Sequence, residues 1–175
     1  ANCPPADAFL SELARENDVV ALSYPVDYWD YLGWKDTAAK PEFALRQKGY
    51  AGRRGDRDVF TPQVIVNGRT QVVGSDREKV RREISLGAEM RRDLTVAVDV
   101  ESTADAVKVH LPSIDAGEPM HATVLLVRYD HSRSVAIGRG ENTGRTLTYA
   151  HLVRSVLPIG MWKGQELTLE LPRQE

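Results

Sequence analysis

Residues 61–73 read TPQVIVNGRTQVV: two β-prone runs joined by Asn67-Gly68 and preceded by Thr61-Pro62. Asn-Gly is the preferred pair for a type I′ hairpin turn, because both central residues of that turn take a positive φ. The stretch therefore predicts a β-hairpin. Proline is the residue before which a cis peptide bond costs only about 0.5–1 kcal/mol. Thr61-Pro62 stands directly before the first strand of this hairpin and is a candidate for such a bond.

A helix and a short strand are expected upstream of the hairpin. Pro4-Pro5 suits the first turn of a helix, because the N–H that proline lacks has no intrahelical partner there. Residues 6–16 continue with one apolar stripe at helical spacing. Residues 19–24 form an apolar run between turn signals, which is typical of a short buried strand.

Two further helices are expected on either side of the hairpin. Pro41 predicts the start of one, which should run through about Ala51. Ser75 and Glu78 have the spacing of a capping box, in which hydroxyl and carboxylate satisfy opposing backbone N–H groups. The helix that this box opens should run to about Arg91.

The periodicity changes from helical to two after residue 92. Alternating apolar residues predict several short strands with turns between them, and this pattern favours a β-sandwich or partial barrel. We therefore expect two domains, 1–92 and 93–175. The expected strands lie at 94–100, 107–111, 122–129, 134–138, 145–149 and 166–171.

The order of these elements indicates the chemistry of the first domain. A cysteine at a helix start, a strand, a helix, Thr-Pro, a hairpin and a helix follow one another, as in a thioredoxin-like fold from its active-site helix onward. A cysteine at a helix N-terminus is favoured as thiolate by the partial positive charge there. Cys3 is thus the candidate catalytic residue. In thioredoxin-like proteins the proline at this place is cis and docks a substrate chain beside the cysteine pair, so the resemblance implies that role for Thr61 and Pro62.

Several motifs are similar to those of the DUF1223 family, whose members are bacterial, secreted or periplasmic, and carry a thioredoxin-like domain. The resemblance spans nearly the whole chain and implies an α/β thioredoxin-like domain followed by an all-β, sandwich-like one. The resemblance implies a fold and a cellular compartment but says little about activity, because the function of the family is poorly defined. The motifs are Cys3-Pro4-Pro5-Ala6-Asp7, residues 26–36, Tyr50-Ala51, Thr61-Pro62-Gln63, Val66-Asn67-Gly68 and residues 140–147.

The resemblance also implies a role for Cys3. The first motif of the family usually reads Cys-x-x-Cys-Pro-Pro-Ala-Asp, so Cys3 matches the second, resolving cysteine. The attacking cysteine would stand just before Ala1, and the first strand of the fold would also lie outside residues 1–175. A lone Cys3 can form a mixed disulfide but cannot complete an intramolecular dithiol–disulfide exchange.

Two other groups of residues leave two interpretations open. The aromatic segment with Tyr28, Trp29 and Trp34 can stack on a ligand or simply form a packed loop. Asp7, one turn after Cys3, can accept a proton from the sulfur. Alternatively, it is a solvated first-turn aspartate that complements the helix dipole, and the sequence favours this second interpretation.

Composition and spacing argue against other classes of protein. A net charge of −2 and a pI near 6.1 give no reason to expect nucleic acid as a partner. No apolar run approaches the roughly 18 residues of a transmembrane helix. One cysteine and four histidines without close ligand spacing predict no metal site, and no cofactor motif is present. Residues 138–144 lack the ending of a phosphate loop and are expected to form a turn.

Two functions follow from this reasoning. One is a thiol–disulfide oxidoreductase of the bacterial envelope, acting on the thiols or disulfides of a partner protein. The other is a non-enzymatic module that binds an envelope protein through the aromatic segment and the β-domain. Whether the protein is an enzyme, and its oligomeric state, are left open by the sequence.

Overall fold

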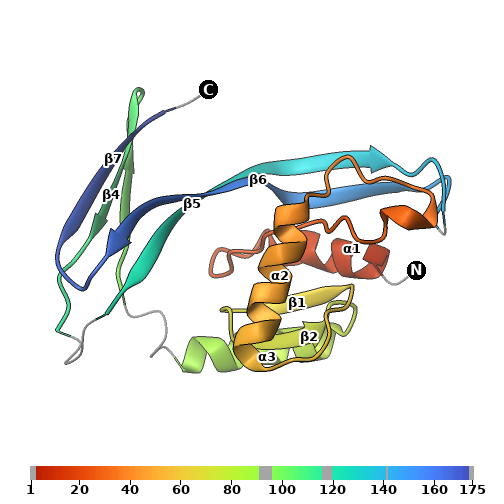
Figure 1. Ribbon diagram of the computed structural model, residues 1–175, viewed down its shortest axis with the longest axis horizontal. Helices are drawn as coiled ribbons and strands as arrows, with labels where there is room; N and C mark the ends of the chain where they lie inside the picture. The colour runs from red at the N-terminus through yellow and green to blue at the C-terminus, as the bar shows by residue number, and fades with distance from the viewer. Residues whose placement is uncertain (1–2, 91–95, 116–119, 141, 174–175) are drawn as a thin grey trace. The chain divides into compact units, whose positions relative to one another are not determined.

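The computed structural model describes residues 3–90, 96–115, 120–140 and 142–173. In these ranges the chain is a mixed α/β protein with three α-helices and three small antiparallel sheets (Figure 1). The helices are α1 (Cys3–Leu13), α2 (Pro41–Arg54) and α3 (Arg77–Glu89), with a short 3₁₀ helix at Asp30–Leu32. The strands are β1 (Gln63–Val66), β2 (Thr70–Val73), β3 (Asp99–Ser102), β4 (Ala106–Leu111), β5 (Ala122–Ala136), β6 (Thr146–Trp162) and β7 (Leu167–Pro172).

The chain divides into two compact units. The first consists of Ala1–Glu89 and Tyr129–Arg154, and the second of Met90–Arg128 and Ser155–Glu175. Residues 92 and 93, at the expected domain boundary, lie outside the described residues, and the division into domains 1–92 and 93–175 stays a prediction.

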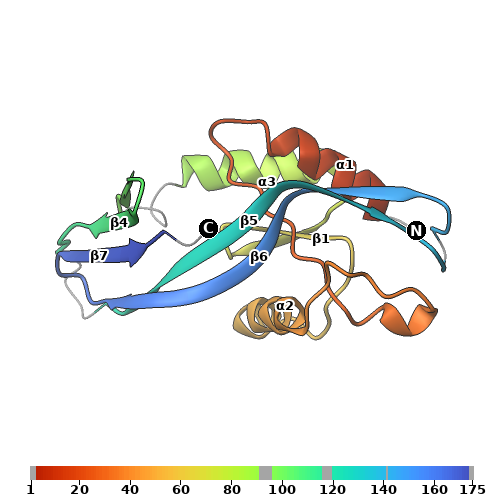
Figure 2. The same ribbon diagram turned by 90° about the horizontal axis from the view of Figure 1, so that it is seen from above.

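The first unit is layered around the β1–β2 hairpin. Helices α1 and α3 lie on one face of the hairpin and α2 lies on the other (Figure 2). Phe9 and Leu13 of α1 pack with Val72 of β2 and Val80 of α3, and all four side chains are buried. Burial of this apolar surface is the main force that holds α1 against the hairpin.

The hairpin confirms the prediction made from its turn. Val66 pairs with Thr70, and the Arg69 N–H donates to the Val66 carbonyl at 3.0 Å. Asn67 and Gly68 have φ values of 50° and 72°, both positive as a type I′ turn requires. The Thr61–Pro62 peptide bond is cis, as expected.

The prediction of a strand at residues 19–24 was wrong. The segment forms only an isolated parallel bridge, in which Ser23 exchanges backbone hydrogen bonds of 3.0 Å with His151 and Val153. Pro25 has no N–H to donate, so a ladder cannot continue past this point. Only part of the apolar run at residues 19–24 is buried: the Ala21 side chain is 5% exposed, whereas the Val20 side chain is 86% exposed.

The helix starts differ in detail from the expected ones. Helix α1 begins at Cys3, before the two prolines, and α2 begins at Pro41 as expected but continues to Arg54.

The prediction of a capping box at the start of α3 was wrong. Asp76, not Ser75, caps this helix: its side chain accepts the Lys79 N–H at 3.2 Å, and its carbonyl accepts the Val80 N–H at 3.0 Å.

The long strands β5 and β6 replace several shorter expected ones. Residues 122–129 and 134–138 were expected as separate strands, yet β5 runs unbroken from Ala122 to Ala136. The polar residues between these two apolar runs suggested a turn between two strands. In the structure they belong to an exposed part of one continuous strand. There the Arg154 guanidinium of β6 donates to the Asp130 carboxylate of β5 at 3.0 Å.

The second unit contains the three-stranded sheet β3-β4-β7. Strands β4 and β7 confirm the runs expected at 107–111 and 166–171, and the strand expected at 94–100 begins only at Asp99 within the described residues. Val109 and Leu111 of β4 pack with Trp162 of β6, and all three are buried.

We expect Asp76→Ala to lower the urea midpoint of unfolding, because it removes the acceptor for an N–H of the first turn of α3. Ser75→Ala is the matched control, and it should leave the midpoint unchanged. A larger effect of Ser75→Ala than of Asp76→Ala in equilibrium urea unfolding would contradict this assignment of the cap.

Candidate functional site

The start of α1 lies beside the cis proline because both pack on Gly74. A β-carbon at Gly74 would meet the Ala6 β-carbon at 3.2 Å and the Pro62 β-carbon at 3.3 Å. The Gly74 N–H donates to the Pro62 carbonyl at 2.9 Å. The absence of a side chain at Gly74 thus lets the first turn of α1, with Cys3 at its start, approach the Thr61–Pro62 segment.

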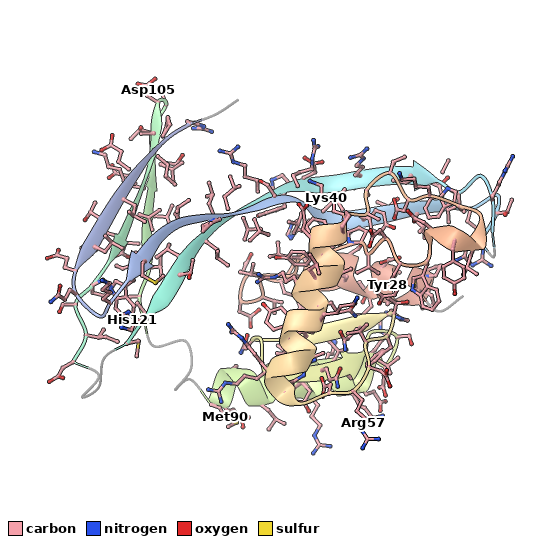
Figure 3. The ribbon with its side chains drawn as sticks, in the orientation of Figure 1. Tyr28, Lys40, Arg57, Met90, Asp105 and His121 are labelled. Carbon is pink, nitrogen blue, oxygen red and sulfur yellow. The ribbon has the colours of Figure 1, made fainter. Side chains whose placement is uncertain are left out.

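The aromatic segment is tied to the same place. The Trp29 indole N–H donates to the Thr61 hydroxyl oxygen at 2.8 Å. Tyr28 lies beside α2 and donates to the Gln47 side chain at 2.9 Å (Figure 3). The Gln47 amide in turn donates to the Phe60 carbonyl at 2.9 Å. These bonds join the aromatic segment and α2 to the chain just before β1.

Trp34 lies in a different environment from Tyr28 and Trp29. It packs against a buried cluster that includes Ala38, Leu147, Tyr149 and Leu152. The structure thus brings four of the predicted binding residues, Tyr28, Trp29, Thr61 and Pro62, to one region near the start of α1.

Asp7 is not the solvated aspartate that we favoured from the sequence. Its Oδ2 atom is fully buried and has no hydrogen-bond partner among the described residues. Burial, together with the negative charge of Asp36, raises the pKa of Asp7 from 3.8 to about 7. Both forms of this carboxyl group are therefore present near neutral pH.

Asp36 and Tyr149 form a buried pair next to Asp7. The Asp36 carboxylate accepts the Ala38 N–H at 2.8 Å and the Tyr149 hydroxyl at 2.5 Å. Asp36 is 7% exposed and Tyr149 8%. Burial raises the pKa of Tyr149 strongly, and the hydrogen bond to Asp36 and the charges of Asp7 and Cys3 raise it further.

Cys3 is electrostatically close to both tyrosines of this region. The charge of its thiolate raises the pKa of Tyr28 and of Tyr149, in each case less than burial does. Cys3 itself is half-buried. The site therefore combines a thiol at a helix start with two carboxyl groups and two tyrosine hydroxyls in a partly desolvated region.

Sequence reasoning missed Asp36 and Tyr149 as site residues. They are 113 positions apart, so no local spacing connects them. The only signal in the sequence is that Asp36 is the last residue of the motif at residues 26–36, which resembles the family but does not by itself indicate a buried carboxylate.

The described residues contain no group of three or more side chains suited to hold a metal ion. His131 and His151 have their ring centroids 5.6 Å apart, and Tyr129 packs on both. The His151 Nδ1 atom is 2.9 Å from the Ala21 carbonyl oxygen, so this histidine supports the segment that bridges to β6.

The fold and the site define a mixed α/β protein with a cysteine at a helix start and with two carboxyl groups, Asp7 and Asp36, that act together with it on Tyr149. The chain belongs to the DUF1223 family, described as proteins of unknown function, whose model matches residues 1–175. No curated protein matches the chain. None of the described helices is both long and apolar enough to cross a membrane.

A crystal structure of a protein from Agrobacterium tumefaciens, solved as a structural genomics target, is similar to this one. The two are 34% identical and superpose with a TM-score of 0.84. The match covers 98% of this chain and 72% of the other.

We expect Gly74→Ala to lower the free energy of unfolding by about 1–3 kcal/mol, because the added methyl group overpacks the contact with Ala6 and Pro62. Gly49→Ala is the matched control in the middle of α2, where a β-carbon meets nothing within 4 Å. It should instead raise stability by about 0.5–1 kcal/mol. Urea unfolding measures both, and equal effects of the two changes would contradict the close contact at Gly74.

The raised pKa of Asp7 predicts a pH dependence of stability. Between 3.8 and about 7 the folded state binds more protons than the unfolded state, so stability falls as the pH rises through this window. In the Asp7→Asn variant the side chain at this position cannot ionise, so the variant should be more stable than the wild type at pH values above about 7. The gain should be a few kcal/mol, since one pKa unit corresponds to about 1.36 kcal/mol. Urea unfolding at both ends of the window tests this, and a wild type and variant with parallel pH curves would contradict it.

Proposed function

We propose that this protein is a thioredoxin-like thiol–disulfide oxidoreductase, with Cys3 as a reacting thiol. The observation that carries the proposal is the packing of Ala6 and Pro62 on Gly74, which puts the start of the cysteine helix beside the segment before β1. The layering of α1 and α3 on one face of the hairpin and α2 on the other supports a thioredoxin-like arrangement of domain 1–92. Domain 93–175 would be the sandwich-like part.

The reaction is thiol–disulfide exchange. In the usual motif of the family a cysteine three positions before Cys3 is the attacking thiol: its thiolate attacks one sulfur of a substrate disulfide and forms a mixed disulfide. The old S–S bond breaks, and its electron pair leaves with the other substrate sulfur, which takes up a proton. The Cys3 thiolate, as the resolving thiol, then attacks the sulfur of that cysteine in the mixed disulfide, and the remaining substrate sulfur leaves with the electron pair and takes up a proton.

The aromatic segment would form the substrate-binding side of the site. Trp29 is 43% exposed while its indole N–H is bonded to Thr61, so the ring presents an apolar surface next to Pro62. A peptide that docks at Thr61 and Pro62 would contact this ring and Tyr28. A direct contact with Trp34 stays a prediction, since that residue packs in the cluster around Tyr149.

The compartment we propose is the periplasm or the extracellular space. Its support is the family, together with the similar protein from a bacterium. Disulfide exchange is a common activity in oxidising compartments, and its partners there would be envelope proteins with thiols or disulfides.

A binding module without catalysis is the second candidate. The observation that favours it is the exposure of three neighbouring apolar residues, Trp29 at 43%, Tyr31 at 75% and Leu32 at 56%. Exposed apolar surface of this kind is typical of a site for a protein partner. In that case the thioredoxin-like part would serve as a scaffold.

The test uses the chain extended upstream as its gene encodes it. We expect the extended chain to reduce insulin with dithiothreitol as electron source, and Cys3→Ser to abolish this activity. Treated with glutathione disulfide, the chain 1–175 should form a mixed disulfide and release one glutathione thiol, and mass spectrometry should show one added glutathionyl group on Cys3. Absence of both the insulin reduction and the adduct would reject the oxidoreductase in favour of the binding module.

A further inference from the structure

We propose that Gln47 is a positioning residue for substrate binding, which fixes the distance between the Tyr28 hydroxyl and the Phe60 carbonyl. The aromatic segment and the chain before the cis proline then form one rigid surface, which binds an apolar side chain next to the disulfide of a polypeptide substrate. This inference rests on the proposed function, because it names the substrate feature that the same site recognises. Gln47 lies in α2, outside every motif from which the site was predicted.

The first argument is the burial of a polar side chain on an otherwise apolar face of α2. Four residues of this helix are buried: Phe43, Ala44, Gln47 and Ala51. Three of them are apolar, and the fourth, Gln47, is only 9% exposed. A buried amide lowers stability unless its hydrogen bonds are made, and an apolar side chain of the same size carries no such cost. The amide at this position therefore has a role that packing alone does not require.

The second argument is that the Gln47 amide joins three segments of the chain. Its Nε2 atom donates to the Phe60 carbonyl at 2.9 Å and to the Gln63 Oε1 atom at 2.8 Å. Its Oε1 atom accepts the Tyr28 hydroxyl at 2.9 Å. Both N–H donors are thus used. One amide binds the aromatic segment, the residue directly before Thr61 and the first residue of β1.

The third argument is that the orientation of this amide is fixed. The Phe60 carbonyl can only accept, so Nε2 faces it and Oε1 faces Tyr28. The Gln63 amide accepts from Gln47 and donates in turn to the Gln71 Oε1 atom of β2. The three glutamines therefore form a head-to-tail chain, and hydrogen bonds in such a chain strengthen one another.

The fourth argument concerns what the Tyr28 hydrogen bond restrains. The ring centroids of Tyr28 and Trp29 are 5.4 Å apart, and the Trp29 indole N–H donates to the Thr61 hydroxyl at 2.8 Å. The aromatic segment is therefore attached to two consecutive residues, to Phe60 through Gln47 and to Thr61 directly. Two attachments restrict the rotation of the segment that a single hydrogen bond allows.

The Trp29 ring is the part of this surface that a substrate can reach, since the residue is 43% exposed and bonded to Thr61. Gln47 is buried, so it acts on a substrate only through Tyr28 and Phe60. A ring held in place binds an apolar side chain more tightly than a mobile one, because less conformational freedom is lost on binding. Loss of the Gln47 amide therefore weakens binding of such substrates and leaves the reaction at the sulfur atoms unchanged.

The experiment uses the chain extended upstream as its gene encodes it, with its thiols reduced. The protein is mixed with an excess of one of two peptide disulfides of equal length, which carry either leucine or glycine next to each cysteine. Single-turnover kinetics then give the half-saturating peptide concentration and the limiting rate of thiol release. Gln47→Met is compared with the wild type, because methionine retains the packing and removes all three hydrogen bonds.

For the leucine peptide, we expect Gln47→Met to raise the half-saturating concentration by about tenfold, the effect of losing about one net hydrogen bond. The limiting rate should not change. Both constants should stay at their wild-type values for the glycine peptide, which offers no side chain to the Trp29 ring. Equal effects on the two peptides would show a general loss of structure and would overturn the positioning role.

Two further variants locate the effect in the hydrogen bonds. Lys48→Ala removes the exposed side chain next to Gln47 in α2 and should behave as the wild type with both peptides. Tyr28→Phe removes only the hydroxyl that the Gln47 amide accepts. Combined with Gln47→Met, it should raise the half-saturating concentration no further, since the hydroxyl has already lost its acceptor. Additive effects of the two changes would contradict a connection through Gln47.

A second readout needs no substrate. In the chain 1–175 we expect the Trp29 indole N–H to exchange with solvent faster in Gln47→Met than in the wild type, as measured by ¹⁵N NMR. The indole of Trp162, which belongs to the second unit, serves as the internal control. An unchanged Trp29 exchange rate would overturn the positioning role. Failure of the oxidoreductase proposal is seen separately, as absence of reaction of the wild type with either peptide.

Discussion

The close contact at Gly74 is the constraint on which the arrangement of the site depends. Three segments meet there: the first turn of α1, the Pro62 segment and the end of the hairpin. A β-carbon at Gly74 would lie 3.2–3.3 Å from the β-carbons of Ala6 and Pro62, so a side chain would fit here only if these neighbours moved. The first turn of α1 approaches the Pro62 segment across this position, which carries no side chain, and burial of the apolar cluster around Phe9 supplies the free energy that holds α1 in place.

The carboxyl groups beside the thiol show that the fold does not maximise its own stability. Burying Asp7 near Asp36 costs free energy whenever both are ionised, and a neutral residue in place of Asp7 would avoid that cost. Only part of it is offset, since Asp36 has two hydrogen-bond donors and Asp7 Oδ2 has none among the described residues. Such local costs are typical of sites that carry chemistry, where groups are arranged for reaction more than for stability.

The sequence predicted those features of the structure that depend on the conformational preferences of a few adjacent residues. Asn67-Gly68 predicted the turn, because few other residues accept two positive φ values, and Pro41 predicted the start of α2. Ser75 was mistaken for the cap of α3 because Asp76, the adjacent residue, offers an equally good acceptor and only the path of the chain decides between them. The raised pKa of Asp7 could not be predicted, because it depends on burial and on Asp36, and Asp36 and Tyr149 come from remote parts of the chain that no periodicity connects.

The discontinuity of the first unit has a consequence for the order in which the site is completed. During synthesis, the helix of Cys3 and the carboxylate of Asp36 leave the ribosome well before Tyr149, which belongs to the returning segment Tyr129–Arg154. Until that segment arrives, Asp36 lacks the hydroxyl donor that shields its charge, and Ala38 and Trp34 lack the cluster around Leu152 against which they pack. The acid–base environment of the thiol is thus among the last features of the first unit to form.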